Sequence, residues 1–163
     1  ACAAAETDDA AVISLCIASE IAAIEDGITG QLQKGVIFID RPGEADRSMM
    51  AKPQLVEDLE DALSAPLESL FNASLDRDKA GWKAPPGIKV SGHAVKYALP
   101  PVETSYIADT SFLFWPPGYS IADDQAIVRG LFTPSIDGAT LTCHLEKTNG
   151  KWRVVKSWLR MYR

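Results

Sequence analysis

The dipeptide Asn149-Gly150 constrains the fold of this chain more than any other short segment. It separates two runs, residues 139–148 and 151–162, in which apolar and polar residues largely alternate. Asn and Gly both tolerate positive φ angles, and a type I′ turn matches the twist of paired strands. The sequence therefore ends in a predicted antiparallel hairpin with a two-residue turn.

A two-residue turn fixes which residues of this hairpin face each other. The side expected to face the core pairs Trp152 with Lys147, Val154 with Leu145, Lys156 with Cys143 and Trp158 with Leu141. On the other side, Arg153 faces Glu146 in a cross-strand ion pair worth about 0.2–1 kcal/mol. Lys156 is unexpected on this mostly apolar side, because a buried ammonium must reach water or a carboxylate. One explanation is that a bulge or the sheet edge exposes Lys156 to water. The other is that Lys156 lines a pocket on the concave face of the sheet.

The first half of the chain has helical periodicity, and the second half has the pattern of strands. An apolar stripe predicts a helix over residues 8–27; its members are Ile13, Ile17, Ile21, Ile24 and Ile28. A second helical region over residues 55–71 is interrupted at Pro66, so we expect two helices that meet near Ser64. About five strand-like runs follow from Ile88 onward.

These elements predict an α+β fold in a single domain spanning residues 1–163. We expect the N-terminal helices to pack on one face of a bent antiparallel sheet of about five strands. We expect residues 1–7 to be a flexible N-terminal segment.

The helices-then-strands order resembles the α+β roll of the nuclear-transport-factor-two-like (cystatin-like) superfamily. The matching pattern lies mainly in the C-terminal hairpin and consists of Leu145, Lys147, Gly150, Trp152 and Val154. The resemblance implies a cone-shaped fold with a pocket between helices and sheet. Some relatives are isomerases or hydratases that use inward Asp and His, and many others bind ligands or proteins. No catalytic motif of the family transfers residue by residue, so the resemblance implies a fold rather than an activity.

Charge and cysteine usage restrict the expected partners and compartment. The net charge of −6 argues against nucleic acid and anionic membranes as partners. The segment around Cys2 resembles the end of a bacterial lipobox, where this residue would carry lipid. Cys16 and Cys143 are then left as a candidate disulfide in an oxidising compartment, with two buried free thiols as the alternative. We expect a periplasmic or secreted protein, anchored to a membrane only through Cys2 if at all; a cytoplasmic protein with a trimmed terminus is the alternative.

The candidates for catalysis are Asp109 and His144. An inward-facing Asp109 would be desolvated and its pKa raised, as a general base in an apolar pocket requires. His144 is a candidate base because histidine titrates near neutral pH. The alternative is that Asp109 faces solvent and that His144 is a half-buried structural residue. With His93 as the only other histidine and no metal-type spacing, we expect no metal and no cofactor.

We expect a non-catalytic exported domain that binds a small apolar ligand or an envelope protein. Its expected ligand-binding residues are Tyr97, Trp115 and Lys156. One alternative is a small pocket enzyme of the isomerase or hydratase type that uses Asp109 or His144. Another is a protein inhibitor or immunity factor whose acidic face blocks a cationic partner. The sequence leaves the ligand, the partner and the oligomeric state open.

Overall fold

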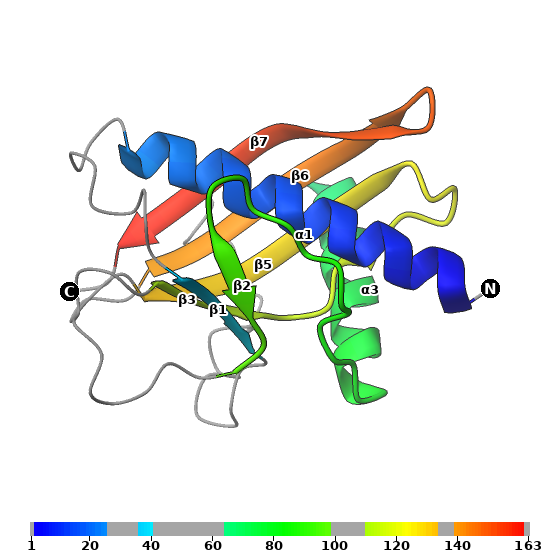
Figure 1. Cartoon of the computed structure of the whole chain (residues 1–163). Coiled ribbons are helices and arrows are strands. Elements are labelled where there is room, and N and C mark those ends of the chain that lie inside the picture. The colour runs from blue at the N-terminus through cyan, green and yellow to red at the C-terminus, as the bar shows by residue number, and fades with distance from the viewer. Residues whose placement is uncertain (1, 26–35, 41–63, 99–109, 134–138, 162–163) are drawn as a thin grey trace.

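The computed structural model describes residues 2–25, 36–40, 64–98, 110–133 and 139–161. This part of the chain forms two helices and a seven-stranded sheet, which confirms the α+β class (Figure 1). In chain order the elements are α1 (Cys2–Glu25), β1 (Val36–Asp40), α3 (Ala65–Lys79), β2 (Ala94–Lys96), β3 (Thr110–Phe114), β4 (Gly118–Tyr119), β5 (Gln125–Thr133), β6 (Ala139–Thr148) and β7 (Lys151–Met161). Neither of these two helices has the length and apolar character that a membrane span requires.

The first helix is longer than its isoleucine stripe predicted. It begins at Cys2 and so includes most of the segment for which we predicted flexibility. Three alanines follow Cys2, and alanine has the highest intrinsic helix propensity. α3 begins at Ala65 with a proline in its first turn, where the missing N–H of Pro66 costs no hydrogen bond.

The sheet is mixed, which corrects the expectation of about five antiparallel strands. Its order is β2-β1-β3-β5-β6-β7, and β4 pairs with β5 outside this path. β1 runs parallel to both β2 and β3, whereas the remaining pairs are antiparallel. Three consecutive residues of β1, Ile37–Ile39, are buried. Such a continuous apolar run is typical of a parallel strand covered on both faces.

α1 packs across one face of β5, β6 and β7 (Figure 1). Its side chains Val12, Ile13 and Ile17 are fully buried against that face. A disulfide between Cys16 and Cys143 fastens the helix to β6. Of the predicted stripe, Ile13, Ile17 and Ile21, whose side chains are described, face the core.

α3 packs on the opposite face, which corrects the expectation that the helices share one face. Phe71 of α3 and Trp115 form a second core cluster, joined by Leu131 and Trp158. Strand alternation turns these strand residues away from the face that carries Cys143. An apolar stripe shows that a helix is covered on one side, but it does not show which face of the sheet covers it.

The C-terminal hairpin has the predicted turn and, in the pairs next to it, the predicted register. Asn149 and Gly150 have φ angles of 53° and 76°, which a type I′ turn requires. The four pairs nearest the turn, from Thr148↔Lys151 to Leu145↔Val154, are confirmed. A bulge at Val155 then shifts the register, so Lys156 pairs with His144 and not with Cys143. The expectation that Lys156 lies on the apolar side is therefore wrong.

Candidate functional site

A cavity of about 340 Å³ lies at the β1–β2 edge of the sheet. Its lining residues are Ile39, Asp40, Lys83, Ala84 and Tyr97. Small-molecule sites span roughly 300–1,000 Å³ and combine an apolar lining with a few polar groups. Both the size and the lining of this cavity match that description.

Within the described part of the chain, three segments far apart in the sequence line the cavity. Ile39 and Asp40 end β1, where the strand still pairs with β3 but its pairing with β2 has stopped at Phe38. Tyr97 directly follows β2, and its hydroxyl oxygen accepts a hydrogen bond of 3.1 Å from the backbone N–H of Ile88. This bond fixes the phenol, and the hydroxyl proton can still be donated to a ligand.

The third segment is the loop after α3, which contributes Lys83 and Ala84. The preceding residue, Trp82, holds this loop in place because its Nε1 donates a hydrogen bond of 2.9 Å to Oδ2 of Asp9 in α1. The position of the cavity wall therefore depends on a buried carboxylate of the first helix.

Asp9 is fully buried and accepts four hydrogen bonds. Arg77 of α3 donates two of them, Trp82 donates the third, and the Tyr119 hydroxyl donates the fourth at 2.6 Å. Burial, followed by the charge of Asp9, raises the pKa of Tyr119 far above its ordinary value, so it donates as a neutral phenol. We call these four residues the Asp9 anchor.

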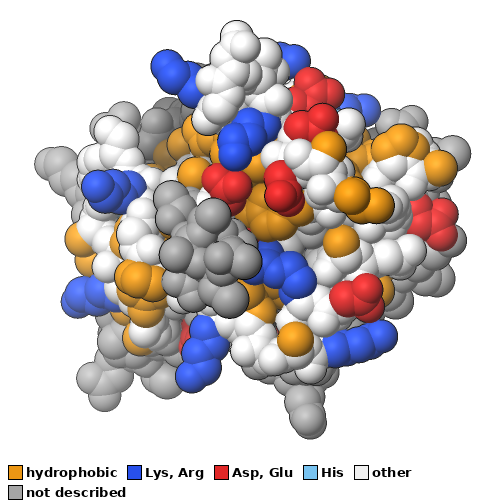
Figure 2. Space-filling view, turned by 90° about the vertical axis from the view of Figure 1, so that its right-hand side faces the viewer, with side chains coloured by type: hydrophobic (Ala, Val, Ile, Leu, Met, Phe, Trp, Pro, Cys, Tyr) orange, Lys and Arg blue, Asp and Glu red, His pale blue; other side chains and the backbone are white. Residues whose placement is uncertain are grey.

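A second set of contacts lies next to the Asp9 anchor and joins Asp8 of α1 to Lys147 and Trp152 of the hairpin. Asp8 accepts a hydrogen bond of 3.2 Å from Trp152 Nε1 and lies 3.4 Å from the ammonium of Lys147. The Trp152 and Tyr119 rings lie 5.8 Å apart. Viewed from this end of the molecule, hydrophobic side chains lie among acidic and basic ones (Figure 2). Since the polar groups of these residues bond to one another, the set connects α1 to the sheet.

The cavity offers binding groups of two kinds. Ile39, Ala84 and the Tyr97 ring present apolar surface, and Asp40 and Lys83 present opposite charges. A ligand with an apolar body and one polar or charged group has complementary contacts here.

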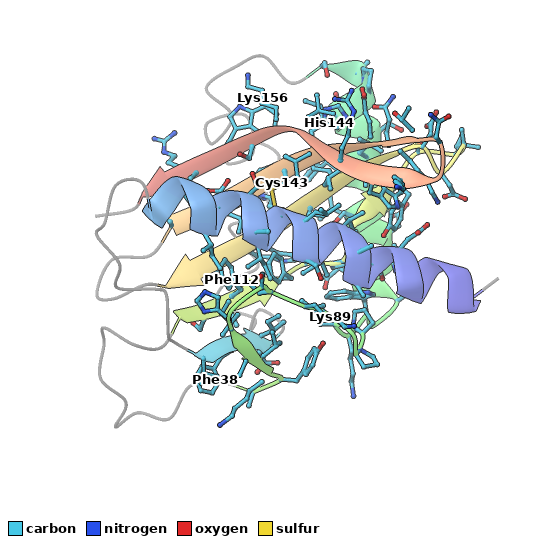
Figure 3. The ribbon with its side chains drawn as sticks, turned by 45° about the horizontal axis from the view of Figure 1, so that its top comes forward. Phe38, Lys89, Phe112, Cys143, His144 and Lys156 are labelled. Carbon is cyan, nitrogen blue, oxygen red and sulfur yellow. A yellow bond between two sulfur atoms is a disulfide. The ribbon has the colours of Figure 1, made fainter. Side chains whose placement is uncertain are left out.

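Of the three ligand-binding residues predicted from the sequence, the cavity includes only Tyr97. Trp115 is fully buried beneath α3. Lys156 is exposed on β7, and its ammonium lies 4.8 Å from the centre of the Trp158 ring. Lys156 and His144 lie on the side of the β6–β7 hairpin away from α1, far from the cavity wall formed by β1 (Figure 3). The structure therefore does not bring the three residues together.

Sequence reasoning missed four lining residues. Asp40 carried a detectable signal, because a charged residue ends the buried run of β1. Lys83 and Ala84 carried none, since their loop reaches the cavity only through the anchored Trp82.

Of the two catalytic candidates, His144 does not line the cavity. Asp109 falls outside the described residues. His144 is half-buried, and its Nε2 lies 3.1 Å from Oε1 of Gln125. Burial lowers the pKa of His144, and the charge of Glu146 opposes this only in part. Within the described residues, no cluster of three metal-ligating side chains occurs.

Cys16 and Cys143, the candidate disulfide of the sequence, have their sulfur atoms bonded at 2.09 Å in the structure. Both residues are fully buried. Cys2 is the first residue of α1, and its predicted lipidation stays a prediction.

No family model, no curated protein and no solved structure matches this chain. The similarity to the nuclear-transport-factor-two-like superfamily therefore stays a prediction.

Proposed function

We propose that this chain is an exported binding domain that holds a small molecule in the cavity at the β1–β2 edge without transforming it. The cavity is the observation that carries this proposal, because its volume and mixed lining suit a small ligand. The apolar part of the ligand packs against Ile39, Ala84 and the ring of Tyr97. Its polar group interacts with Lys83 or Asp40 at the rim.

The bonded pair Cys16 and Cys143 supports export as part of this proposal. Structural disulfides persist in the periplasm and outside the cell, and they are rare where thiols are kept reduced. The proposed location is therefore periplasmic or extracellular. A lipid anchor at Cys2 fits the same location and would be recognised by the mass of a diacylglyceryl group on the mature protein.

The enzyme alternative has less support than binding. An isomerase or hydratase needs its base within hydrogen-bond reach of a bound substrate. His144 does not line the cavity, and its Nε2 forms a hydrogen bond with the side chain of Gln125. Asp109, the other candidate base, lies outside the described residues.

Native mass spectrometry of the chain purified from a bacterial periplasm tests the proposal. We expect a bound small molecule on the wild type and a reduced bound fraction in Tyr97→Ala and Lys83→Ala. Lys89→Ala is the matched control, because Lys89 is an exposed lysine outside the cavity. A ligand that stays bound in both cavity variants would place the site elsewhere. A wild type that neither retains a ligand nor gains thermal stability from any member of a metabolite library would contradict the function itself.

A further inference from the structure

The first half of β7 lies at an edge of the sheet that the described strands form. Among the described strands, β7 pairs with β6 alone. The two-residue turn makes Thr148↔Lys151 a hydrogen-bonded pair, so the next pair, Lys147↔Trp152, is not hydrogen-bonded. The backbone N–H of Lys147 indeed donates to Asp124 on the other side of β6, at 2.7 Å. By the same alternation, Trp152 directs its N–H and C=O away from β6.

Val154 has the same orientation, because Leu145↔Val154 is the next non-hydrogen-bonded pair. Trp152 and Val154 therefore offer two N–H and two C=O groups to an added strand. We call residues Lys151–Val155 the β7 edge segment.

The side chains of the β7 edge segment alternate in character. Lys151 and Arg153 are exposed on the face away from α1, whereas Trp152 and Val154 pack against the α1-side core. Arg153 lies 3.1 Å from Glu146, with its own side chain 62% exposed. Glu146 pairs with Arg153, Lys151 pairs with Thr148, and the whole of β7 contains no acidic residue. The segment is cationic on one face and apolar on the other, in a chain of net charge −6.

These features disfavour a second copy of the chain as the occupant of this edge. Two β7 strands side by side would bring the cations of one copy close to those of the other, and like charges at adjacent positions are destabilising. The bulge at Val155 also limits the regular edge to a few residues. Cations and bulges are the devices by which sheets prevent self-pairing. The same cations attract a strand of opposite charge.

We propose that the β7 edge segment binds an extended segment of a partner protein in which acidic and apolar residues alternate. The segment adds to the sheet as an extra strand, and its backbone pairs with Trp152 and Val154. Its acidic side chains lie beside Lys151 and Arg153, and its apolar side chains extend the surface of Trp152 and Val154. Backbone pairing supplies the affinity, and the alternation of charge supplies the selectivity.

A fluorescein-labelled peptide of about seven residues, alternating glutamate and valine, is the probe for this proposal. We expect saturable binding by fluorescence anisotropy at low salt, and no binding of a lysine–valine peptide of equal length. Two further peptides carry N-methyl groups on the glutamates or on the valines. Because alternate amides of a strand point to the same side, at least one of them should lose binding. If both N-methylated peptides bind as tightly as the unmodified peptide, the interaction depends on charge alone and the proposal is overturned.

Variants of the chain locate the site. Lys151→Glu combined with Arg153→Gln should weaken binding of the acidic peptide by about tenfold or more. Lys89→Glu reverses the charge of a lysine that lies distant from β7 (Figure 3). It should leave the affinity for the acidic peptide unchanged within about twofold. Hydrogen exchange should slow at the amides of Trp152 and Val154 when the peptide binds.

Three outcomes would overturn the proposal. One is no binding of the acidic peptide up to about 1 mM. Another is an unchanged affinity in the Lys151→Glu/Arg153→Gln variant. The third is a dimer of the chain alone, seen by light scattering, in which the amides of Trp152 and Val154 are already protected. In that case a second copy occupies the edge.

Discussion

Asp9 and Arg77 form a two-point ion pair that joins the two described helices. Arg77 Nη2 lies 2.6 Å from Oδ2 of Asp9, and Nη1 lies 2.9 Å from Oδ1. The carboxylate is fully buried, whereas the Arg77 side chain is 29% exposed. Arg77 also donates to the backbone carbonyl of Pro117 at 2.7 Å, directly before β4. One buried charge therefore holds α1, α3 and the start of β4 together.

Replacing Asp9 with Asn should destabilise the fold strongly. The substitution leaves the guanidinium of Arg77 without its charged partner, and breaking a buried pair costs about 3–5 kcal/mol. Because Arg77 is partly exposed and water screens its charge, we expect the free energy of unfolding to fall by about 3 kcal/mol. Urea unfolding followed by circular dichroism measures the loss. Asp8→Asn is the control, since Asp8 is 28% exposed and its removal should cost less than about 1 kcal/mol. Equal losses in the two variants would show that Asp9 contributes no more to the stability of the fold than Asp8 does.

The bond between Cys16 and Cys143 closes a loop with a sequence separation of 127. A loop of this length predicts a stabilisation of about 4–5 kcal/mol, chiefly through the unfolded state. We expect Cys16→Ala/Cys143→Ala to lose roughly that amount in urea unfolding. Alkylation of the denatured, non-reduced protein should modify no cysteine of this pair. Alkylation of both residues in protein purified from an oxidising compartment would contradict the disulfide.

The hairpin shows how far local sequence determines structure. The Asn149-Gly150 turn and the pairing next to it follow from the turn chemistry. The bulge was missed because it inserts one residue and reverses the parity of everything beyond it. Its signal was the adjacent pair Val154 and Val155, where two apolar residues interrupt the alternation. Once the bulge is counted, Lys156 lies on the exposed side and needs no special explanation.

The sheet order and the cavity depend on contacts that local patterns do not encode. The run Val36–Asp40 has the apolar, β-branched pattern of a buried strand, but its place between β2 and β3 depends on pairing with distant residues. The cavity unites β1, the loop after α3 and Tyr97 after β2. Tyr97 alone was predicted, because the cavity forms only after these segments come together.

Replacing Gly118 with Ala should disrupt the contact between β4 and α3. A Cβ atom at this position would lie 1.9 Å from the carbonyl oxygen of Leu70 and 2.8 Å from the amide nitrogen of Ser74. Both are backbone atoms of α3, so relief requires the helix to move. We expect a loss of about 3 kcal/mol or more in urea unfolding. Gly92→Ala is the control: its φ of 77° adds strain, but nothing lies within 4 Å, and the cost should be about 1–2 kcal/mol. A smaller loss for Gly118→Ala than for this control would contradict the close packing of α3 on β4.

Glu20 makes a contribution to the stability of the fold that should fall as pH rises. This residue is 2% exposed on α1. Burial raises the pKa of its carboxyl above the ordinary 4.5, and a hydrogen bond with Ser157 of β7 opposes the rise only in part. The folded chain therefore binds this proton more tightly than the unfolded chain does. The resulting stabilisation is fully present below pH 4.5 and is lost as pH rises through the folded-state pKa.

A neutral side chain at this position avoids the cost of a buried charge at neutral pH. Glu20→Gln should therefore be more stable than the wild type at about pH 7, and the gain should shrink toward about pH 4. Urea unfolding at the two pH values measures both differences. Ser157→Ala is the matched test. Without the opposing hydrogen bond the pKa of Glu20 rises further, so the free energy of unfolding of this variant should fall more between the two pH values than that of the wild type. A gain in Glu20→Gln that is the same at both pH values would show that the carboxyl does not titrate differently in the folded and unfolded chains.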